Sequence, residues 1–92
     1  MDLTLFVPLY NEEKRPKVGE YISSISQIQG LTLVLVNDGS SDDTLSMLEL
    51  SKGPNIKIVD FPTNQGKGEA LRKAMRDYLL QNTVEIIGYL DC

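Results

Sequence analysis

Short continuous runs of apolar residues recur along the chain, separated by longer polar and amphipathic segments. The runs lie at residues 3–7, 31–36, 56–59 and 84–90. Residues 33–36 show no alternation between apolar and polar positions, which is typical of a strand that helices cover on both faces of a parallel sheet. After each of the first three runs comes a polar, turn-rich segment and then a helical pattern. The chain therefore predicts repeated strand–helix units in an α/β fold.

The spacing of apolar residues between these strands predicts three helices. The first spans about Lys17 to Gln29. The second begins after Ser40 or Ser41, where Ser40 and Asp43 resemble a capping box, and ends at Gly53-Pro54.

The third helix has the clearest pattern and spans about Gly68 to Gln81. The expected apolar faces of the first and third helices consist of Val18, Ile22, Ile25 and Ile28, and of Leu71, Ala74, Met75, Tyr78 and Leu79. Right-handed crossovers between parallel strands then favour the sheet order 3-2-1-4, with a topological switch between strands 1 and 4. We expect a Rossmann-like, three-layer α/β/α fold with a parallel sheet of about four strands.

Composition and charge narrow the class of protein. The chain has 92 residues, of which 41% are hydrophobic and 24% charged, which suits one small soluble domain. Its net charge of −4 argues against a general nucleic-acid-binding protein, which usually carries a basic face. The single cysteine, Cys92, cannot form an internal disulfide, and no apolar run approaches the roughly 20 residues of a membrane span. We expect a cytoplasmic domain without a signal peptide.

An aspartate follows the second strand, at the place where open α/β sheets bind ligands. Turn formation and helix capping account for residues 40–43, whereas Asp38 precedes the cap and is not needed by the helix. Gly39 lets the chain turn sharply after it. We therefore interpret Asp38 as a ligand-binding residue.

Two other loops and the last strand carry candidate binding groups. Tyr10 offers a ring for stacking on a planar base, and Asn11 and Glu12 offer acceptors, although a solvated loop explains these residue types equally well. Gly66-Lys67-Gly68 opens the third helix, where backbone amides and a lysine favour phosphate; the alternative is a flexible loop with an incidental lysine. Asp91, at the tip of the fourth strand, is of the type that binds a divalent metal, but one carboxylate alone is not a metal site.

Taken together, four segments resemble the N-terminal half of a family 2 glycosyltransferase with the GT-A fold. Residues 7–13 resemble the opening V-P-x-Y-N-E-E of that family, and residues 36–44 resemble its V-D-D-G-S-x-D-x-T segment. Residues 64–72 resemble the N-x-G-K-G-x-A-x-R stretch of the polyprenyl (dolichyl) phosphate sugar transferases, and residues 90–92 resemble the start of the D-x-D metal motif. The segments occur in the family's order and with its spacing over essentially the whole chain.

The resemblance implies a site for the nucleotide part of a UDP- or GDP-sugar. Tyr10 would lie against the base, Asp38 would hydrogen-bond the base or the ribose, and Lys67 would lie near the diphosphate. The nucleotide-sugar-binding residues implied in this way are Pro8, Tyr10, Glu12, Asp38, Gly39 and Lys67.

The resemblance also implies a metal and shows two departures. Asp91 would be the first carboxylate of the D-x-D motif, which binds Mg²⁺ or Mn²⁺ bridging the sugar diphosphate. Asn37 stands where the family usually has an aspartate, and at most a supporting hydrogen bond changes. The second metal aspartate would follow Cys92.

In this family the acceptor site and the catalytic base usually come from a second half of the enzyme. We therefore expect residues 1–92 to be an incomplete GT-A domain that binds nucleotide weakly, contains no catalytic residue and transfers no sugar by itself. The acceptor of the parent enzyme would be a polyprenyl phosphate, and the parent would work at the cytoplasmic face of a membrane. Membrane contact would be made only by parts outside this sequence.

Two other functions compete with this interpretation. A receiver-type signalling domain of flavodoxin-like fold would use Asp60 as a phosphoacceptor, but it needs a fifth strand with a lysine near its end, and neither is present. The second alternative is a non-catalytic interaction module.

The fourth strand predicts an association of the chain with itself. Its outer edge would carry Val84, Ile86, Ile87 and Tyr89 without a neighbouring strand. Bare apolar edges invite pairing with another chain, so we expect self-association there.

Overall fold

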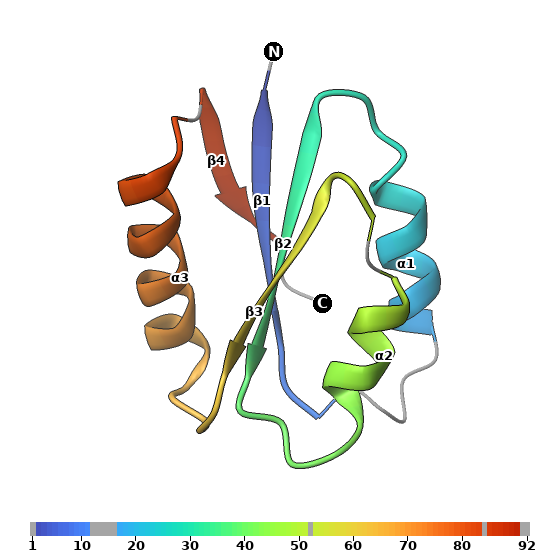
Figure 1. Ribbon diagram of the computed structural model, residues 1–92, viewed down its shortest axis with the longest axis vertical. Coiled ribbons are helices and arrows are strands. Elements are labelled where there is room, and N and C mark those ends of the chain that lie inside the picture. The colour runs from blue at the N-terminus through green and yellow to red at the C-terminus, as the bar shows by residue number, and fades with distance from the viewer. Residues whose placement is uncertain (1, 12–16, 52, 84, 91–92) are drawn as a thin grey trace.

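The computed structural model describes residues 2–11, 17–51, 53–83 and 85–90. They form one parallel sheet in the order β3-β2-β1-β4, with helices on both faces (Figure 1). The strands are β1 (Leu3–Leu9), β2 (Leu31–Asp38), β3 (Ile56–Phe61) and β4 (Ile86–Tyr89). The helices are α1 (Lys17–Ile25), α2 (Thr44–Leu50) and α3 (Lys67–Gln81). The predicted three-layer fold and the predicted strand order are confirmed.

Two apolar clusters fill the spaces between the sheet and its helices. On one face Leu33 and Leu35 of β2 pack with α1 and α2, and on the other Val34 and Val36 pack with α3. All four side chains are fully buried, which explains why this strand shows no alternation of apolar and polar residues. Burial of each such side chain contributes about 1.5–3 kcal/mol. Because β2 supplies fully buried side chains to both clusters, it lies at the centre of the fold.

The strand register aligns the polar ends of three strands. Leu9 of β1 lies beside Asn37 of β2, and Asn37 lies beside Asp60 of β3. Because the strands are parallel, the loops that follow them emerge at one edge of the sheet. We call the segments 10–11, 39–43 and 62–66 the carboxyl-edge loops.

Helix α1 is shorter than predicted, ending at Ile25 and not at Gln29. Beyond Ile25 the backbone tightens into three-residue turns, with the N–H of Ile28 donating to the carbonyl of Ile25 at 3.1 Å. The side chain of Asn55 donates to the carbonyls of Ser26 and Leu31, which holds the turn beside β2. Ile28 is consequently 55% exposed and does not belong to the apolar face.

Helix α2 begins at Thr44, later than the serine pair at 40–41, so the predicted capping box is wrong. Asp42 accepts the N–H of Thr44 at 3.0 Å, and the hydroxyl of Ser40 is engaged by Asn37 and Asn11. The side chain of Ser40, which the local sequence predicted to cap the helix, is thus used in hydrogen bonds with other loops.

The remaining differences are small. Helix α3 begins at Lys67, one residue before the predicted start, and ends at Gln81 as predicted, but Leu79 is 48% exposed and lies outside the apolar face. Tyr78 does pack inward, with its ring edge-on to Phe6 at a centroid distance of 5.6 Å. Strand β4 covers only Ile86–Tyr89, and Val84 lies outside the described residues. None of the helices in the described part of the chain is long and apolar enough to cross a bilayer.

Candidate nucleotide-binding site

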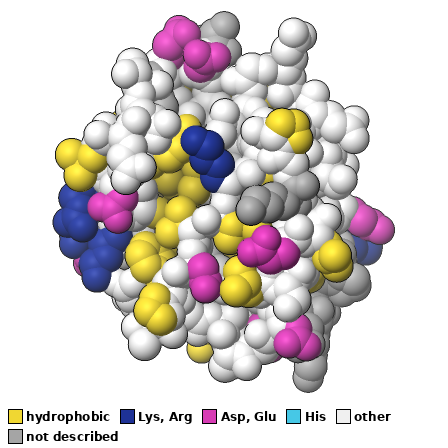
Figure 2. Space-filling view, in the orientation of Figure 1, with side chains coloured by type: hydrophobic (Ala, Val, Ile, Leu, Met, Phe, Trp, Pro, Cys, Tyr) yellow, Lys and Arg dark blue, Asp and Glu magenta, His cyan; other side chains and the backbone are white. Residues whose placement is uncertain are grey.

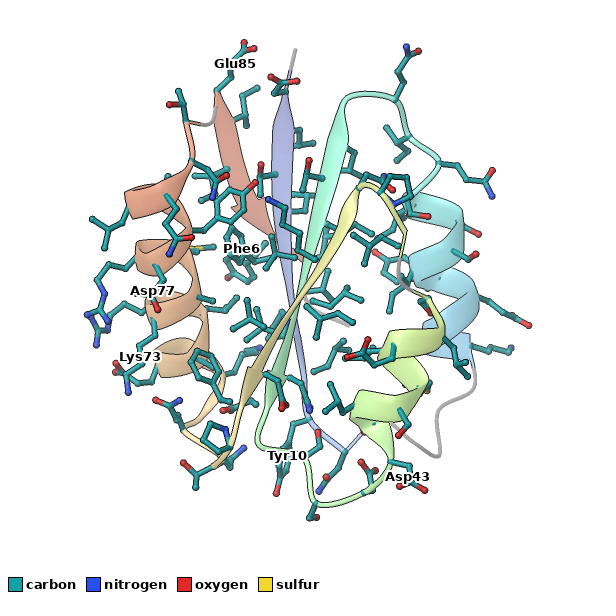
Figure 3. All side chains as sticks on the ribbon, viewed as in Figure 1. Phe6, Tyr10, Asp43, Lys73, Asp77 and Glu85 are labelled. Atoms are coloured by element: carbon teal, nitrogen blue, oxygen red, sulfur yellow. The ribbon has the colours of Figure 1, made fainter. Side chains whose placement is uncertain are left out.

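The carboxyl-edge loops and the residues beside them carry most of the residues that the sequence predicted to bind ligand. Tyr10 follows β1, Gly39 follows β2, and Lys67 is the first residue of α3 after the third loop. Figure 3 shows Tyr10 at the end of the molecule where β1 and β2 finish. Hydrogen bonds between these loops decide how the marked residues are held.

Asp38 joins the end of β2 to the loop that follows β3. One carboxylate oxygen accepts the backbone N–H of Gln65 at 2.8 Å, and the other accepts the side-chain amide of Asn64 at 3.1 Å. The same amide also donates to the carbonyl of Asp38 at 3.1 Å. The aspartate is only 3% exposed, so these contacts fix its orientation. A carboxylate has about four lone-pair sites, so two protein donors do not use all of them, although little of this carboxylate's surface is exposed.

Gly39 is required by the close approach of the same two loops. Its φ of +64° lies in the left-handed region, and a Cβ there would come within 2.2 Å of the backbone at Thr63 and Asn64. A side chain at this position would therefore push the third loop away from β2. The role of Gly39 is thus explained by backbone packing, whether or not a ligand is bound.

The loop after β1 is fastened to the loop after β2 through Asn11. The N–H of Asn11 donates to the hydroxyl of Ser40 at 3.0 Å, and the side-chain oxygen of Asn11 accepts the N–H of Ser41 at 2.9 Å. Asn11 has a φ of +52°, a left-handed conformation that asparagine tolerates better than most residues. Its neighbour Tyr10 is 46% exposed, so its ring has surface available for a ligand.

The other predicted site residues differ in accessibility. Pro8 lies inside β1, is buried and lies beside Val36, so it offers a ligand little surface. Lys67 is exposed at the start of α3, where the helix N-terminus favours negative charge. Glu12 and Asp91 lie outside the described residues.

One pair of opposite charges on the first turns of α3 lies within the helix. Arg72 forms an ion pair with Glu69, and its hydrogen bonds hold the pKa of Glu69 below the usual value. The same hydrogen bond raises the pKa of Arg72. The guanidinium is therefore engaged by its own helix.

Two asparagines have structural roles that the sequence interpretation missed. Asn37 is 2% exposed, donates to Asp60 at 2.9 Å and accepts the hydroxyl proton of Ser40. Asn64 binds both the side chain and the carbonyl of Asp38. The available signal was the residue type, because an amide donates and accepts at once and so can join two elements.

Asp60 does not occupy the place that a receiver domain would give its phosphoacceptor. The flavodoxin-like sheet has the order 2-1-3-4-5, whereas this sheet has the order β3-β2-β1-β4. Asp60 lies on the edge strand β3 and accepts a hydrogen bond from Asn37. The geometry therefore gives no support to the signalling alternative.

The described residues do not by themselves form the expected metal site. Within residues 2–11, 17–51, 53–83 and 85–90, no group of three or more histidine, cysteine, aspartate or glutamate side chains is placed to hold an ion. The one predicted ligand, Asp91, lies outside these ranges.

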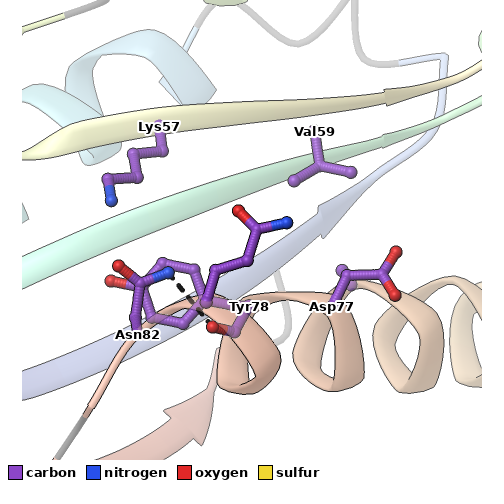
Figure 4. Close-up of a pocket in the computed structure, with 7 residues that line it drawn as sticks. Lys57, Val59, Asp77, Tyr78 and Asn82 are labelled. Atoms are coloured by element: carbon purple, nitrogen blue, oxygen red, sulfur yellow. Dashed lines mark hydrogen bonds between the residues drawn. The ribbon is translucent and has the colours of Figure 1, made fainter.

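A separate pocket of about 270 Å³ lies between β3 and α3, away from the predicted site residues (Figure 4). The ammonium group of Lys57 lies 5.0 Å from the centre of the Tyr78 ring at its wall. On this face of the molecule, basic side chains also gather over α3, beside exposed apolar surface (Figure 2). None of the residues lining the pocket was predicted to bind nucleotide.

Comparison with known proteins gives consistent results. A family model described as glycosyl transferase family 2 matches residues 4–92. The dolichyl-phosphate beta-glucosyltransferase ALG5A of Trichomonas vaginalis is 42% identical over 80 residues, covering 76% of this chain and 25% of that protein. The dolichyl-phosphate beta-glucosyltransferase of Drosophila melanogaster is 32% identical over 87 residues, covering 82% and 27%.

A solved structure with the same fold is mannosyltransferase PcManGT from Pyrobaculum calidifontis, in complex with GDP-Man and Mn²⁺. It superimposes with a TM-score of 0.74 at 29% identity, covering 92% of this chain and 25% of that one. The chain thus spans about a quarter of the length of these three relatives.

Proposed function

Because this chain belongs to glycosyl transferase family 2, we propose that it forms the nucleotide-binding part of a glycosyltransferase. The whole enzyme would transfer a sugar from a UDP- or GDP-sugar to an acceptor. The observation that supports this proposal best is the hydrogen bonding that ties the three carboxyl-edge loops together around Asp38 and Ser40. Ligands of open α/β sheets bind at this edge.

In this proposal the exposed ring of Tyr10 stacks on the base of the nucleotide. Asp38, whose orientation is set by Gln65 and Asn64, uses its remaining lone pairs for the base or ribose. Lys67 and the first amides of α3 attract the diphosphate, since both present positive charge at the helix N-terminus.

In this proposal the metal would be Mg²⁺ or Mn²⁺, and Asp91 would supply one of its ligands. A relative at 29% identity was solved with Mn²⁺ and GDP-Man, which supports a divalent cation of this kind. When bound, such an ion stabilises the negative charge that develops on a leaving nucleotide diphosphate.

The acceptor of the whole enzyme is a polyprenyl phosphate in this proposal, and the enzyme acts at the cytoplasmic face of a membrane. Two relatives that are 42% and 32% identical are named dolichyl-phosphate beta-glucosyltransferases, which supports this acceptor class. The 92-residue chain by itself would bind nucleotide weakly and transfer no sugar.

The β4 edge also supports self-association as a further part of the proposal. Ile86 and Tyr89 of this edge strand are 43% and 57% exposed, and no lysine or proline interrupts β4. The opposite edge strand, β3, carries the exposed charges of Lys57 and Asp60, which protect an edge from pairing. A second copy of the chain would therefore add at β4.

Titration of the ¹⁵N-labelled chain with UDP and with GDP, each with the diamagnetic ion Mg²⁺, tests the proposed site by NMR. Shifts confined to Tyr10, Asp38 and the first residues of α3 are expected. Tyr10→Ala should lower the affinity for the nucleotide about tenfold, because base stacking contributes roughly 1–3 kcal/mol. Tyr21→Ala is the matched control, since Tyr21 is 41% exposed but lies on α1. If neither nucleotide shifts any of these signals, the chain does not bind nucleotide and the proposal is wrong.

A further inference from the structure

A buried side-chain amide connects the edge strand β3 to the loop that carries Tyr10. Asn37 occupies the penultimate position of β2 and is 2% exposed. Its amide nitrogen donates to the carboxylate of Asp60 on β3, and its amide oxygen accepts the hydroxyl proton of Ser40. Both functional ends of this side chain are therefore used, each toward a different element.

The hydrogen bonds continue from Ser40 toward β1. Because the hydroxyl of Ser40 gives its proton to Asn37, its oxygen lone pairs are oriented to accept the N–H of Asn11 at 3.0 Å. Asn11 in turn accepts the N–H of Ser41 at 2.9 Å. The series Asp60–Asn37–Ser40–Asn11 thus runs from the edge strand to the residue next to Tyr10.

We propose that Asn37 is a positioning residue for the nucleotide site: by binding Asp60 and Ser40 together, it sets the orientation of the loop that carries Tyr10. The effect on nucleotide binding rests on the proposed function, whereas the effect on the loop does not.

The charge of Asp60 explains why an amide is required at this position. The sequence motif that the chain resembles has an aspartate here, but a second carboxylate would face Asp60 across the 2.9 Å now bridged by an N–H group. Like charges at this separation repel, and the oxygen of residue 37 would have to move away from β3. Asn37 and Asp60 are therefore chemically complementary, with an N–H donor facing a carboxylate acceptor.

The pair offers a reciprocal exchange as its test. Asn37→Asp alone creates the repulsion, whereas the double variant Asn37→Asp with Asp60→Asn restores one N–H donor between the residues and still leaves an oxygen for Ser40. Asp60→Ala removes the acceptor of Asn37 without adding a buried charge. Gln29→Glu adds the same charge as Asn37→Asp at an exposed position at the opposite end of the sheet, and serves as the control.

Hydrogen exchange of the Asn11 and Ser41 amides reports the loop, because both N–H groups donate to side chains of this network. We expect exchange to be about tenfold faster in Asn37→Asp and severalfold faster in Asp60→Ala, and unchanged in Gln29→Glu. The double variant should return to within about twofold of the parent chain, as expected when one interaction is restored. Affinity for GDP or UDP with Mn²⁺ should fall most in Asn37→Asp, less in Asp60→Ala and not at all in Gln29→Glu, and it should recover in the double variant.

Exchange rates in Asn37→Asp and Asp60→Ala equal to those in Gln29→Glu would overturn the proposal, as would a folded double variant that shows no recovery. If Asn37→Asp does not fold, Asp60→Ala and the double variant still decide the question, because neither puts two carboxylates together. A parent chain that binds neither nucleotide would refute the proposed function and leave the loop coupling to be judged by exchange alone. Equal nucleotide affinity in all folded variants, despite altered exchange, would refute the positioning role in binding.

Discussion

The carboxylate of Asp38 and the backbone N–H of Gln65 lie 2.8 Å apart, although the two residues are separated by 27 positions in the chain. This contact fastens the loop before α3 to the end of β2. It means that one aspartate orients the loop leading to Lys67 and also lies at the edge where nucleotide is proposed to bind. Loss of this side chain would therefore affect stability and binding together.

Asp38→Ala should destabilise the domain by about 1–3 kcal/mol, because it leaves the donors on Gln65 and Asn64 without their acceptor. Asp38→Asn should cost less, since one amide oxygen can still accept the N–H of Gln65. Urea unfolding of both variants measures the difference. Asp43→Ala is the control, because Asp43 makes no side-chain hydrogen bond at the start of α2; a loss as large as that of Asp38→Ala there would contradict the assignment.

Gly39→Ala should be more damaging than its small added volume suggests. The new Cβ would meet backbone atoms at 2.2 Å, in a left-handed conformation that alanine disfavours. We expect a loss of more than about 2 kcal/mol in the free energy of unfolding, with displacement of residues 62–66. Gly53→Ala is the comparison, because nothing lies within 4 Å of a Cβ there and φ is not in the left-handed region. Equal melting temperatures for the two variants would show that the loops are not in close contact.

Two leucines on α3 test which face of the helix is buried. Leu71 is 8% exposed and belongs to the cluster with Phe6, whereas Leu79 is 48% exposed. Leu71→Ala should cost about 2–4 kcal/mol, and Leu79→Ala less than about 1 kcal/mol. Chemical denaturation of the two variants gives both numbers. A reversed order would show that α3 is rotated relative to the sheet.

The exposed edge of β4 should drive concentration-dependent association of the chain. Ile86→Lys should shift sedimentation toward the monomer, because a charged side chain on an edge strand opposes pairing. Leu50→Lys is the control: Leu50 is 89% exposed on α2, so the same kind of substitution is made away from the edge. A parent chain that sediments as a monomer at high concentration would contradict the prediction.

The pattern of apolar residues determined the class of fold and the order of the strands. The uninterrupted run in β2 required apolar cover on both faces, and right-handed crossovers then favoured the sheet order that the structure has, β3-β2-β1-β4. The sequence made Asp38 a candidate for ligand binding because it lies at the end of a strand and is not needed to cap the following helix.

Tertiary structure alone decided the partners of the polar groups. Local sequence assigned Ser40 to a helix cap, but its hydroxyl binds Asn37 and Asn11, the latter 29 positions away. The end of α1 is likewise set by Asn55, which lies 29 positions beyond Ser26. Apolar burial is nonspecific and can be inferred from periodicity, whereas a hydrogen bond needs a particular donor and acceptor at about 3 Å. Only the folded chain brings such atoms together, which is why the sequence predicted the edge that carries the candidate residues and not the hydrogen-bond network that holds them.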